Sequence, residues 1–347
     1  MVEQKTAERM RVPVIAVTGH LGSGKTSLLN HLLREPGARI GVVINDFGEL
    51  NVDAALVTGQ VDQAAAISGG CLCCLPNAGG LDDALQQLSQ PKLRLDAIIV
   101  EASGVADPVA LARIIQFSDV GNVRLGGVVE VIDAVEHFRT VDTEPIPPSR
   151  YAVTTLAVIG KTDLLTAAER EAVSARIRDR IRERNPDVYT VTADYGRIDP
   201  QLVFDTVTEE DPLDQLPIAQ LLREEAAQDH TGHQHASSVS REFAETVLPG
   251  ALVDLLENPP AGAYRMKGRL RVRGPRQPRG YLVNVVGRSV QVERLREVPE
   301  AGELVVIGMD LATDAAAASL EALAAADGGS PDKEGLARLE RHRRLSE

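Results

Sequence analysis

Three cysteines carry the strongest chemical signal in this chain, because they are the only ones among 347 residues and lie within four positions. They sit in the run Gly-Gly-Cys-Leu-Cys-Cys at 69–74, as Cys71, Cys73 and Cys74. Thiolates at this density gain from sharing one soft metal cation, which offsets their mutual repulsion. A redox switch is an alternative, although a disulfide between neighbouring cysteines needs strained geometry. A third interpretation is three small buried apolar residues. The pattern favours a metal site.

A glycine-rich loop is the second chemical motif. It follows a β-branched run at 12–17 and precedes a helical apolar pattern at 27–33, which is the order of elements in a P-loop. Backbone N–H groups in such a loop surround phosphate oxygens, and the helix N-terminus adds partial positive charge. Lys25 is expected to reach the β and γ phosphates, and the Thr26 hydroxyl to ligate Mg²⁺. The predicted nucleotide contacts in this loop are Gly19, Gly22, Ser23, Gly24, Lys25, Thr26 and Ser27.

An acidic residue, Glu101, ends a second buried apolar run at 97–100. An unpaired buried carboxylate is costly, so packing alone does not explain this residue. We interpret Glu101 as the acid near Mg²⁺ or its water. The alternative is a capping acid for the helix that follows.

Lys161 and Asp163 follow the apolar run at 156–159, in the positions of the guanine-reading pattern Asn-Lys-x-Asp. In that pattern the aspartate accepts hydrogen bonds from the base, and the lysine stem covers the face of the base. Gly160 stands where asparagine is expected, so one side-chain contact to the base is lost. Lys161 and Asp163 still favour GTP over ATP. The alternative is a surface loop leading into a helix at Ala167.

The overall composition narrows the class of protein. A formal net charge of −13 argues against nucleic acid or an anionic membrane as the main partner. Aromatic residues make up 3 % with no tryptophan, which disfavours a base-stacking platform. No apolar run has the length of a membrane span, and the start lacks the hydrophobic stretch of a signal peptide. We expect a cytoplasmic protein with no nucleic-acid or membrane partner.

Alternating strands and helices in the first half predict an α/β fold, a P-loop NTPase domain with a mostly parallel sheet. Its motifs should lie just after the strands, where open α/β sheets bind ligands. The strands expected here are 39–44, 96–100, 127–132, 153–159 and 188–192. The predicted order of parts is a P-loop domain with the cysteine motif at 1–210, a linker at 211–238, a smaller α+β domain at 239–314 and a charged helical tail at 315–347.

The second half shows strand patterns at 241–247, 264–272, 281–292 and 303–307, and a helix pattern at 250–256. Basic residues in the second of these strands alternate with apolar ones, which predicts one solvated face: Arg269, Arg271 and Arg273. Before these strands, three of the seven histidines fall close together, at His230, His233 and His235. The tract is either a solvated linker or a weak metal-collecting segment.

Together the P-loop, the segment 45–53, the cysteine run and the segment 101–108 resemble the CobW-type metallochaperone GTPases. These are relatives of the GTPases that mature nickel enzymes. The segments 264–268 and 304–308 are similar to that family's C-terminal domain. The resemblance implies slow GTP hydrolysis coupled to delivery of a transition metal to a client metalloprotein.

The same resemblance assigns roles to single residues. It implies that Lys25, Glu101 and Asp46 are catalytic, and that Thr26 and Glu101 hold Mg²⁺. Asp46 and Glu49 fall in the family's acidic switch segment, where they could support Mg²⁺ or add ligands to the thiolate metal; the family more often has glutamate at position 46. Zn²⁺ is the preferred cargo for a thiolate site, with Co²⁺ as the alternative. Because the cysteines lie between two nucleotide-sensing segments, we expect metal affinity to depend on the nucleotide.

Two other classes of function stay open for this sequence. A P-loop kinase or ATPase with structural cysteines would turn over an added acceptor and ignore zinc. A metal sensor or store would bind metal without hydrolysing nucleotide. The client and the oligomeric state, including a homo-oligomer, are not set by the sequence.

Overall fold

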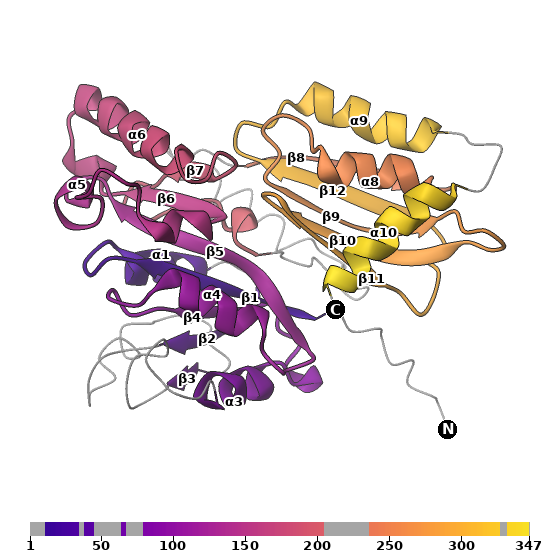
Figure 1. Cartoon of the computed structure of the whole chain (residues 1–347), viewed down its shortest axis with the longest axis horizontal. Coiled ribbons are helices and arrows are strands. Elements are labelled where there is room, and N and C mark those ends of the chain that lie inside the picture. The colour runs from indigo at the N-terminus through magenta and orange to yellow at the C-terminus, as the bar shows by residue number, and fades with distance from the viewer. Residues whose placement is uncertain are drawn as a thin grey trace, which may run out of the picture. The chain divides into compact units, whose positions relative to one another are not determined.

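Seven parallel strands form the sheet of the first half, in the order β3-β2-β4-β1-β5-β6-β7 (Figure 1). The computed structural model describes residues 11–34, 38–44, 64–66, 79–204, 236–326 and 332–346. The strands are β1 (Val12–Gly19), β2 (Ile40–Ile44), β3 (Ala64–Ala66), β4 (Ala97–Glu101), β5 (Val123–Asp133), β6 (Leu156–Gly160) and β7 (Tyr189–Thr192). The predicted α/β fold with a parallel sheet is confirmed.

Helices cover this sheet because its central strands are apolar on both faces. Every residue of β1, β2, β4 and β6 is buried, the pattern of parallel strands enclosed by helices. The helices are α1 (Lys25–Leu32), α3 (Gly79–Leu88), α4 (Pro108–Gln116), α5 (His137–Thr140) and α6 (Ala167–Arg182). Asp107 caps α4, and Thr166 with Glu169 forms a capping box that starts α6.

The strand bounds differ from expectation in three places. β5 begins at Val123, four residues before the predicted start, and β6 begins at Leu156 because Val153 ends a 3₁₀ turn, Ser149–Ala152. β3, a short alanine run, was not predicted, because three alanines carry little strand propensity.

The second half forms a separate compact unit that runs from residue 235 onward. Its five antiparallel strands lie in the order β11-β10-β9-β12-β8. Three helices lie together on one face of this sheet (Figure 1). The elements are β8 (Ser237–Phe243), α8 (Pro249–Glu257), β9 (Arg265–Val272), β10 (Arg279–Val286), β11 (Ser289–Arg294), β12 (Gly302–Gly308), α9 (Thr313–Ala325) and α10 (Lys333–Ser346).

Three features of this unit differ from the sequence interpretation. The strand expected at 241–247 lies at Ser237–Phe243, because the chain bends after Phe243 and only Val247 pairs again, in an isolated bridge with Val272. The pattern at 281–292 is a hairpin rather than one strand, because Gly287 adopts φ 57° and turns the chain between β10 and β11. The stretch 315–347 contributes Leu320, Leu323 and Leu339 to the core of the unit. Within the described ranges, no helix combines the length and apolar character that a bilayer crossing requires.

Candidate functional site

The phosphate-binding loop connects β1 to α1, and its glycines are required by geometry. Gly19, Gly22 and Gly24 all have positive φ, at 147°, 77° and 105°, where side chains are disfavoured. Gly19 also lacks room for a side chain, since a methyl group there would come within 2.5 Å of the Val131 carbonyl oxygen. The loop therefore presents its backbone at the N-terminus of α1, as an anion site requires.

Two side chains at the head of α1 face this loop. The Lys25 ammonium is buried and donates to the carbonyl oxygens of Gly19, at 3.1 Å, and His20, at 3.3 Å. The Thr26 hydroxyl donates to Glu101 Oε1 at 3.1 Å, although 75 residues separate the two in sequence. Glu101 is only 4 % exposed at the end of β4. The predicted pairing of the P-loop with the acid after the second apolar run therefore exists in space.

The turn after β4 touches the P-loop directly. A methyl group at Gly104 would lie 2.6 Å from both the backbone nitrogen and the Cα of Leu21. No side chain fits at position 104 unless one of the two turns moves. The segment that carries Glu101 and the loop that would carry the phosphates are thus in van der Waals contact.

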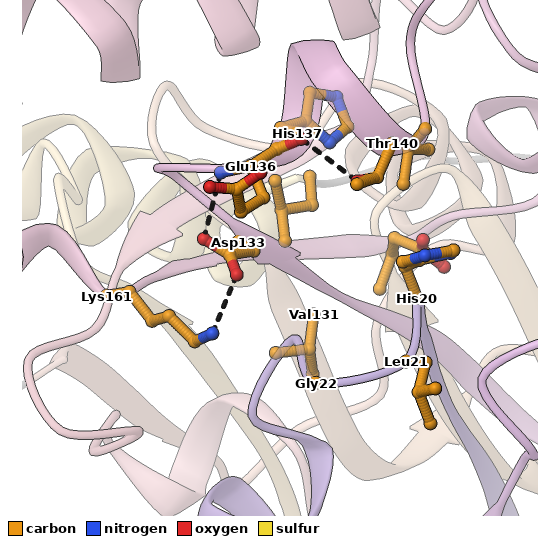
Figure 2. A pocket seen from close by; sticks show the side chains of 12 residues that line it. His20, Leu21, Gly22, Val131, Asp133, Glu136, His137, Thr140 and Lys161 are labelled. Carbon is orange, nitrogen blue, oxygen red and sulfur yellow. Dashed lines mark hydrogen bonds and ion pairs between the residues drawn. The ribbon is translucent and has the colours of Figure 1, made fainter.

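The loop after β6 carries the predicted base-reading residues. Lys161 Nζ lies 2.7 Å from Asp133 Oδ2, at the end of β5 (Figure 2). Asp163 is half-buried in the short 3₁₀ turn Thr162–Leu164. Gly160 has room for a Cβ, because a methyl group there would make ordinary van der Waals contacts with the carbonyl oxygens of Ile132, at 3.7 Å, and Ser23, at 3.9 Å. The backbone would therefore accept the asparagine that this position lacks.

A hydrogen-bond network around the buried Thr162, which sequence reasoning missed, holds this base loop. The fully buried Thr162 hydroxyl donates to Asp194 Oδ1 at 2.9 Å, and Arg170 Nε donates to the Thr162 carbonyl at 3.1 Å. Asp194 follows β7, the neighbour of β6 in the sheet. The available signal was the position of Asp194 just after a predicted strand, at the edge where ligands bind.

A pocket of about 280 Å³ lies beside the P-loop (Figure 2). It is bordered by the loop at 20–22, the end of β5, helix α5 and Lys161. His137 forms part of its wall, with Nε2 2.5 Å from the Tyr151 hydroxyl. Burial lowers the pKa of His137 to about 4, against a smaller opposing effect of the Asp142 carboxylate. His137 is therefore neutral at pH 7 and contributes shape rather than charge.

A second buried acid, Glu130, lies in the middle of β5 and was also missed. Its carboxylate accepts from the Thr18 hydroxyl at 2.5 Å and from Arg150 at 2.7 Å. Thr18 directly precedes the first glycine of the P-loop, so the ion pair supports the strand that delivers the loop. The signal was available, because Glu130 interrupts an apolar run as Glu101 ends one.

The predicted transition-metal ligands lie outside the described residues. This applies to Cys71, Cys73 and Cys74, to Asp46 and Glu49, and to the histidines of the tract at 230–235. Within the part of the chain that the structure describes, no group of three or more histidine, cysteine or acidic side chains is placed to hold a metal ion.

Two known family models match this chain, one in each half. The family model "CobW/HypB/UreG, nucleotide-binding domain" matches residues 13–188, and the "Cobalamin synthesis protein cobW C-terminal domain" matches 236–324. "Zinc chaperone YjiA" of Escherichia coli is 35 % identical over 202 residues, which are 56 % of this chain and 61 % of YjiA. "Zinc chaperone CobW" of a Sinorhizobium species is 28 % identical over 91 % of this chain and 98 % of its own length.

Among solved structures, the zinc-bound YjiA GTPase from E. coli is 24 % identical and covers 90 % of this chain and 98 % of its own, with a TM-score of 0.42. The chain spans less than two thirds of YjiA in the sequence comparison. The two family models together account for both structural units. The chain therefore belongs to the CobW/HypB/UreG family, with a nucleotide-binding domain followed by a CobW-type C-terminal domain.

Proposed function

We propose that this protein is a GTPase that carries a transition metal to a client metalloprotein in the cytoplasm. The observation that carries the proposal is the meeting of Thr26 with Glu101, 3.1 Å apart at the head of the P-loop helix. The names of its relatives support it, since they are called zinc chaperones, or a zinc-regulated GTPase metalloprotein activator in Schizosaccharomyces pombe.

The residues at this point suit a magnesium ion. A hydroxyl and a carboxylate supply hard oxygen ligands, which Mg²⁺ prefers together with phosphate oxygens and water. Thr26 and Glu101 would hold it, and the ion would neutralise charge that develops on the phosphates. Glu101 ends β4 and the turn that contacts the P-loop at Gly104 follows it in the chain, so movement of that turn would move Glu101.

The P-loop supplies the rest of the catalytic stabilisation. Backbone N–H groups of the loop and the Lys25 ammonium face the place where phosphate charge increases during transfer. The carbonyl oxygens of Gly19 and His20 hold the Lys25 ammonium beside the loop. Asp46, assigned as a further catalytic residue from the family resemblance, lies outside the described residues.

Guanine selection is assigned to Asp163 and Lys161. Asp163 would accept from N1–H and the exocyclic amine of guanine, and the Lys161 stem would cover the base. Replacing Asp163 with asparagine reverses one donor–acceptor pair and favours xanthine, which carries oxygen where guanine carries the amine. We expect D163N to bind GTP about 10- to 100-fold more weakly and to gain binding of XTP, measured by competition against a fluorescent nucleotide. Equal GTP affinity in wild type and D163N would contradict the assignment.

The cargo site is assigned to Cys71, Cys73 and Cys74. Three thiolates leave one position of a tetrahedral Zn²⁺ open, which suits transfer better than permanent storage. Co²⁺ is the second candidate, and Asp46 or Glu49 could supply the fourth ligand. The histidine tract at 230–235 is a candidate metal-collecting segment.

One experiment separates this function from its rivals. GTP hydrolysis is measured with and without one equivalent of Zn²⁺ or Co²⁺, in wild type and Cys73→Ala. Metal-dependent hydrolysis that the cysteine variant loses supports the proposal. Hydrolysis indifferent to both metals would indicate an ordinary NTPase, and metal binding without hydrolysis would indicate a sensor.

A second measurement tests the coupling between the two sites. Zinc affinity is compared in the presence of GDP and of a non-hydrolysable GTP analogue. Linkage requires that any difference be matched by an equal effect of zinc on nucleotide affinity. Equal zinc affinities would remove the coupling and leave both sites in place.

A further inference from the structure

Tyr195 is the exposed aromatic residue of the loop after β7, and its backbone is strained. Its φ is 54°, in the left-handed region that a bulky side chain rarely adopts. The ring is 74 % exposed, whereas Tyr151, Tyr264 and Tyr281 are buried. Among the residues that the structure describes, the Tyr195 side chain makes no hydrogen bond or ring contact. Packing and hydrogen bonding inside the domain therefore do not explain this side chain.

The backbone conformation of this turn does not require tyrosine at position 195. Asp194 and Arg197 form an antiparallel bridge, and Tyr195 and Gly196 between them both have positive φ. Two-residue turns of this kind strongly favour Asn-Gly, because asparagine tolerates the left-handed conformation. Glycine occupies the second position, but the first carries a large ring. Strain of this kind that local structure does not need is characteristic of functional sites.

The loop lies between the two parts of the nucleotide site. On one side Asp194 accepts from Thr162, within the base-reading loop. On the other side Gly196 approaches the first turn of α1, where a methyl group would come within 3.0 Å of the Ser27 Cβ. A nucleotide with phosphates at α1 and a base at Asp163 has to span this interval. Tyr195 lies between Asp194 and Gly196, at the carboxyl edge of the sheet, where open α/β sheets bind ligands.

We propose that the Tyr195 ring stacks on the base of the bound nucleotide. The inference rests on the proposed guanine-nucleotide function and adds a residue to its binding site. Aromatic rings stack on any base, so Tyr195 supplies affinity and Asp163 supplies selectivity. Stacking also compensates for the base contact that is lost at Gly160.

Tyrosine-to-tryptophan replacement gives a direct readout, because the chain contains no tryptophan. In Tyr195→Trp the single indole should lose emission as GDP and Mg²⁺ are added, with a midpoint that matches the GDP affinity from calorimetry. Phe117→Trp is the matched control, since Phe117 is 79 % exposed at the far end of α4 and its emission should not change. Unchanged emission of Trp at position 195 while GDP binds would overturn the inference.

Three further variants separate the ring from the backbone. Tyr195→Phe keeps the ring and should bind GDP within about twofold of wild type, whereas Tyr195→Asn and Tyr195→Gly suit the left-handed backbone but should bind GDP about 5- to 100-fold more weakly. Pyrophosphate has no base, so its affinity should be the same in all three. Wild-type GDP affinity in the Asn and Gly variants would overturn the stacking role, and failure of wild type to bind GDP would remove the proposed function as well.

Discussion

The two sheets of this protein treat charged residues in opposite ways. In the parallel sheet, Glu101 and Glu130 are 4 % and 2 % exposed and each has a hydrogen-bonding partner from another strand or helix. In the antiparallel sheet, Arg265 at the start of β9 is 5 % exposed, but most charged side chains of β9 and β12 alternate with core residues, as Arg269 and Glu303 do. Those two residues are exposed and lie opposite each other in register.

The difference follows from how each sheet is covered. A parallel sheet enclosed on both faces has no solvated side, so an acid within it needs a partner and is retained only for a specific task. A sheet with helices on one face has a free choice of polar residues on the other. A buried charge in the first sheet is therefore informative about function, whereas a charge on the exposed face of the second sheet is largely uninformative.

The largest expected effect concerns the buried ion pair of β5. Glu130→Ala removes the carboxylate that pairs with Arg150 and one of the two acceptors of the Thr18 hydroxyl, and breaking such a buried ion pair costs about 3–5 kcal/mol. Glu303→Ala on the antiparallel sheet should change stability by no more than about 0.5 kcal/mol. Hydrogen exchange of β1 and β5 peptides, compared with β9 and β12 peptides, measures each effect in its own unit. Equal losses of hydrogen-exchange protection in the two variants would contradict the predicted difference between the two sheets.

Activity should separate the two sheets in the same way. Lys25→Ala removes a preorganised cation from the P-loop, and loss of one such group lowers turnover by about 100- to 1,000-fold. Arg269→Ala removes a cation from the exposed strand face and should leave turnover unchanged. Steady-state GTP hydrolysis measures both, with circular dichroism to verify folding. Residual activity above a tenth of wild type in Lys25→Ala would argue against the assigned role.

Acidification should destabilise the first unit before the second. Burial holds the pKa of His137 at about 4, so between pH 6.5 and 4 the unfolded chain takes up a proton that the folded chain does not. Stability falls as pH drops through this window, by about 1.4 kcal/mol per unit. In the second unit, hydrogen bonds from His342 and then Arg338 lower the pKa of Glu257 below 4.5, so its contribution is lost only at lower pH.

Urea unfolding at pH 7.5 and pH 5 tests this order. The difference in midpoint between wild type and His137→Gln should shift between the two pH values, because only wild type carries the titrating group. The difference between wild type and Glu257→Gln should stay constant over the same interval. A constant difference for His137→Gln would show that this histidine does not titrate as its burial requires.

The smallest predicted effect concerns nucleotide selection by the loop after β6. Position 160 has room for a side chain, so Gly160→Asn should fold normally and restore one base contact. One added hydrogen bond corresponds to about a 2- to 10-fold gain in GTP affinity over ATP. Competition binding of the two nucleotides measures the ratio, and an unchanged ratio would mean that the loop presents this position away from the base.

Sequence reasoning found the contiguous motifs and placed Glu101 near the P-loop, 75 residues from Thr26, but it missed the partners that neighbouring strands supply. The P-loop was recognisable because its strand, glycines and helix are contiguous. Asp133, the partner of Lys161, and Asp194, the partner of Thr162, lie 28 and 32 residues away from them. Their pairing depends on β5, β6 and β7 being neighbours, which periodicity does not specify. Glu130 could have been found by the argument applied to Glu101.

Because Gly104 has no side chain, the turn after β4 packs directly against the P-loop. Because the turn after β4 rests on the peptide backbone of the P-loop with no clearance, neither can shift by more than a fraction of an ångström without displacing the other. A single methyl group at position 104 would push the two turns apart. Gly104→Ala is therefore a minimal substitution with which to restrict movement of the turn after β4 relative to the P-loop.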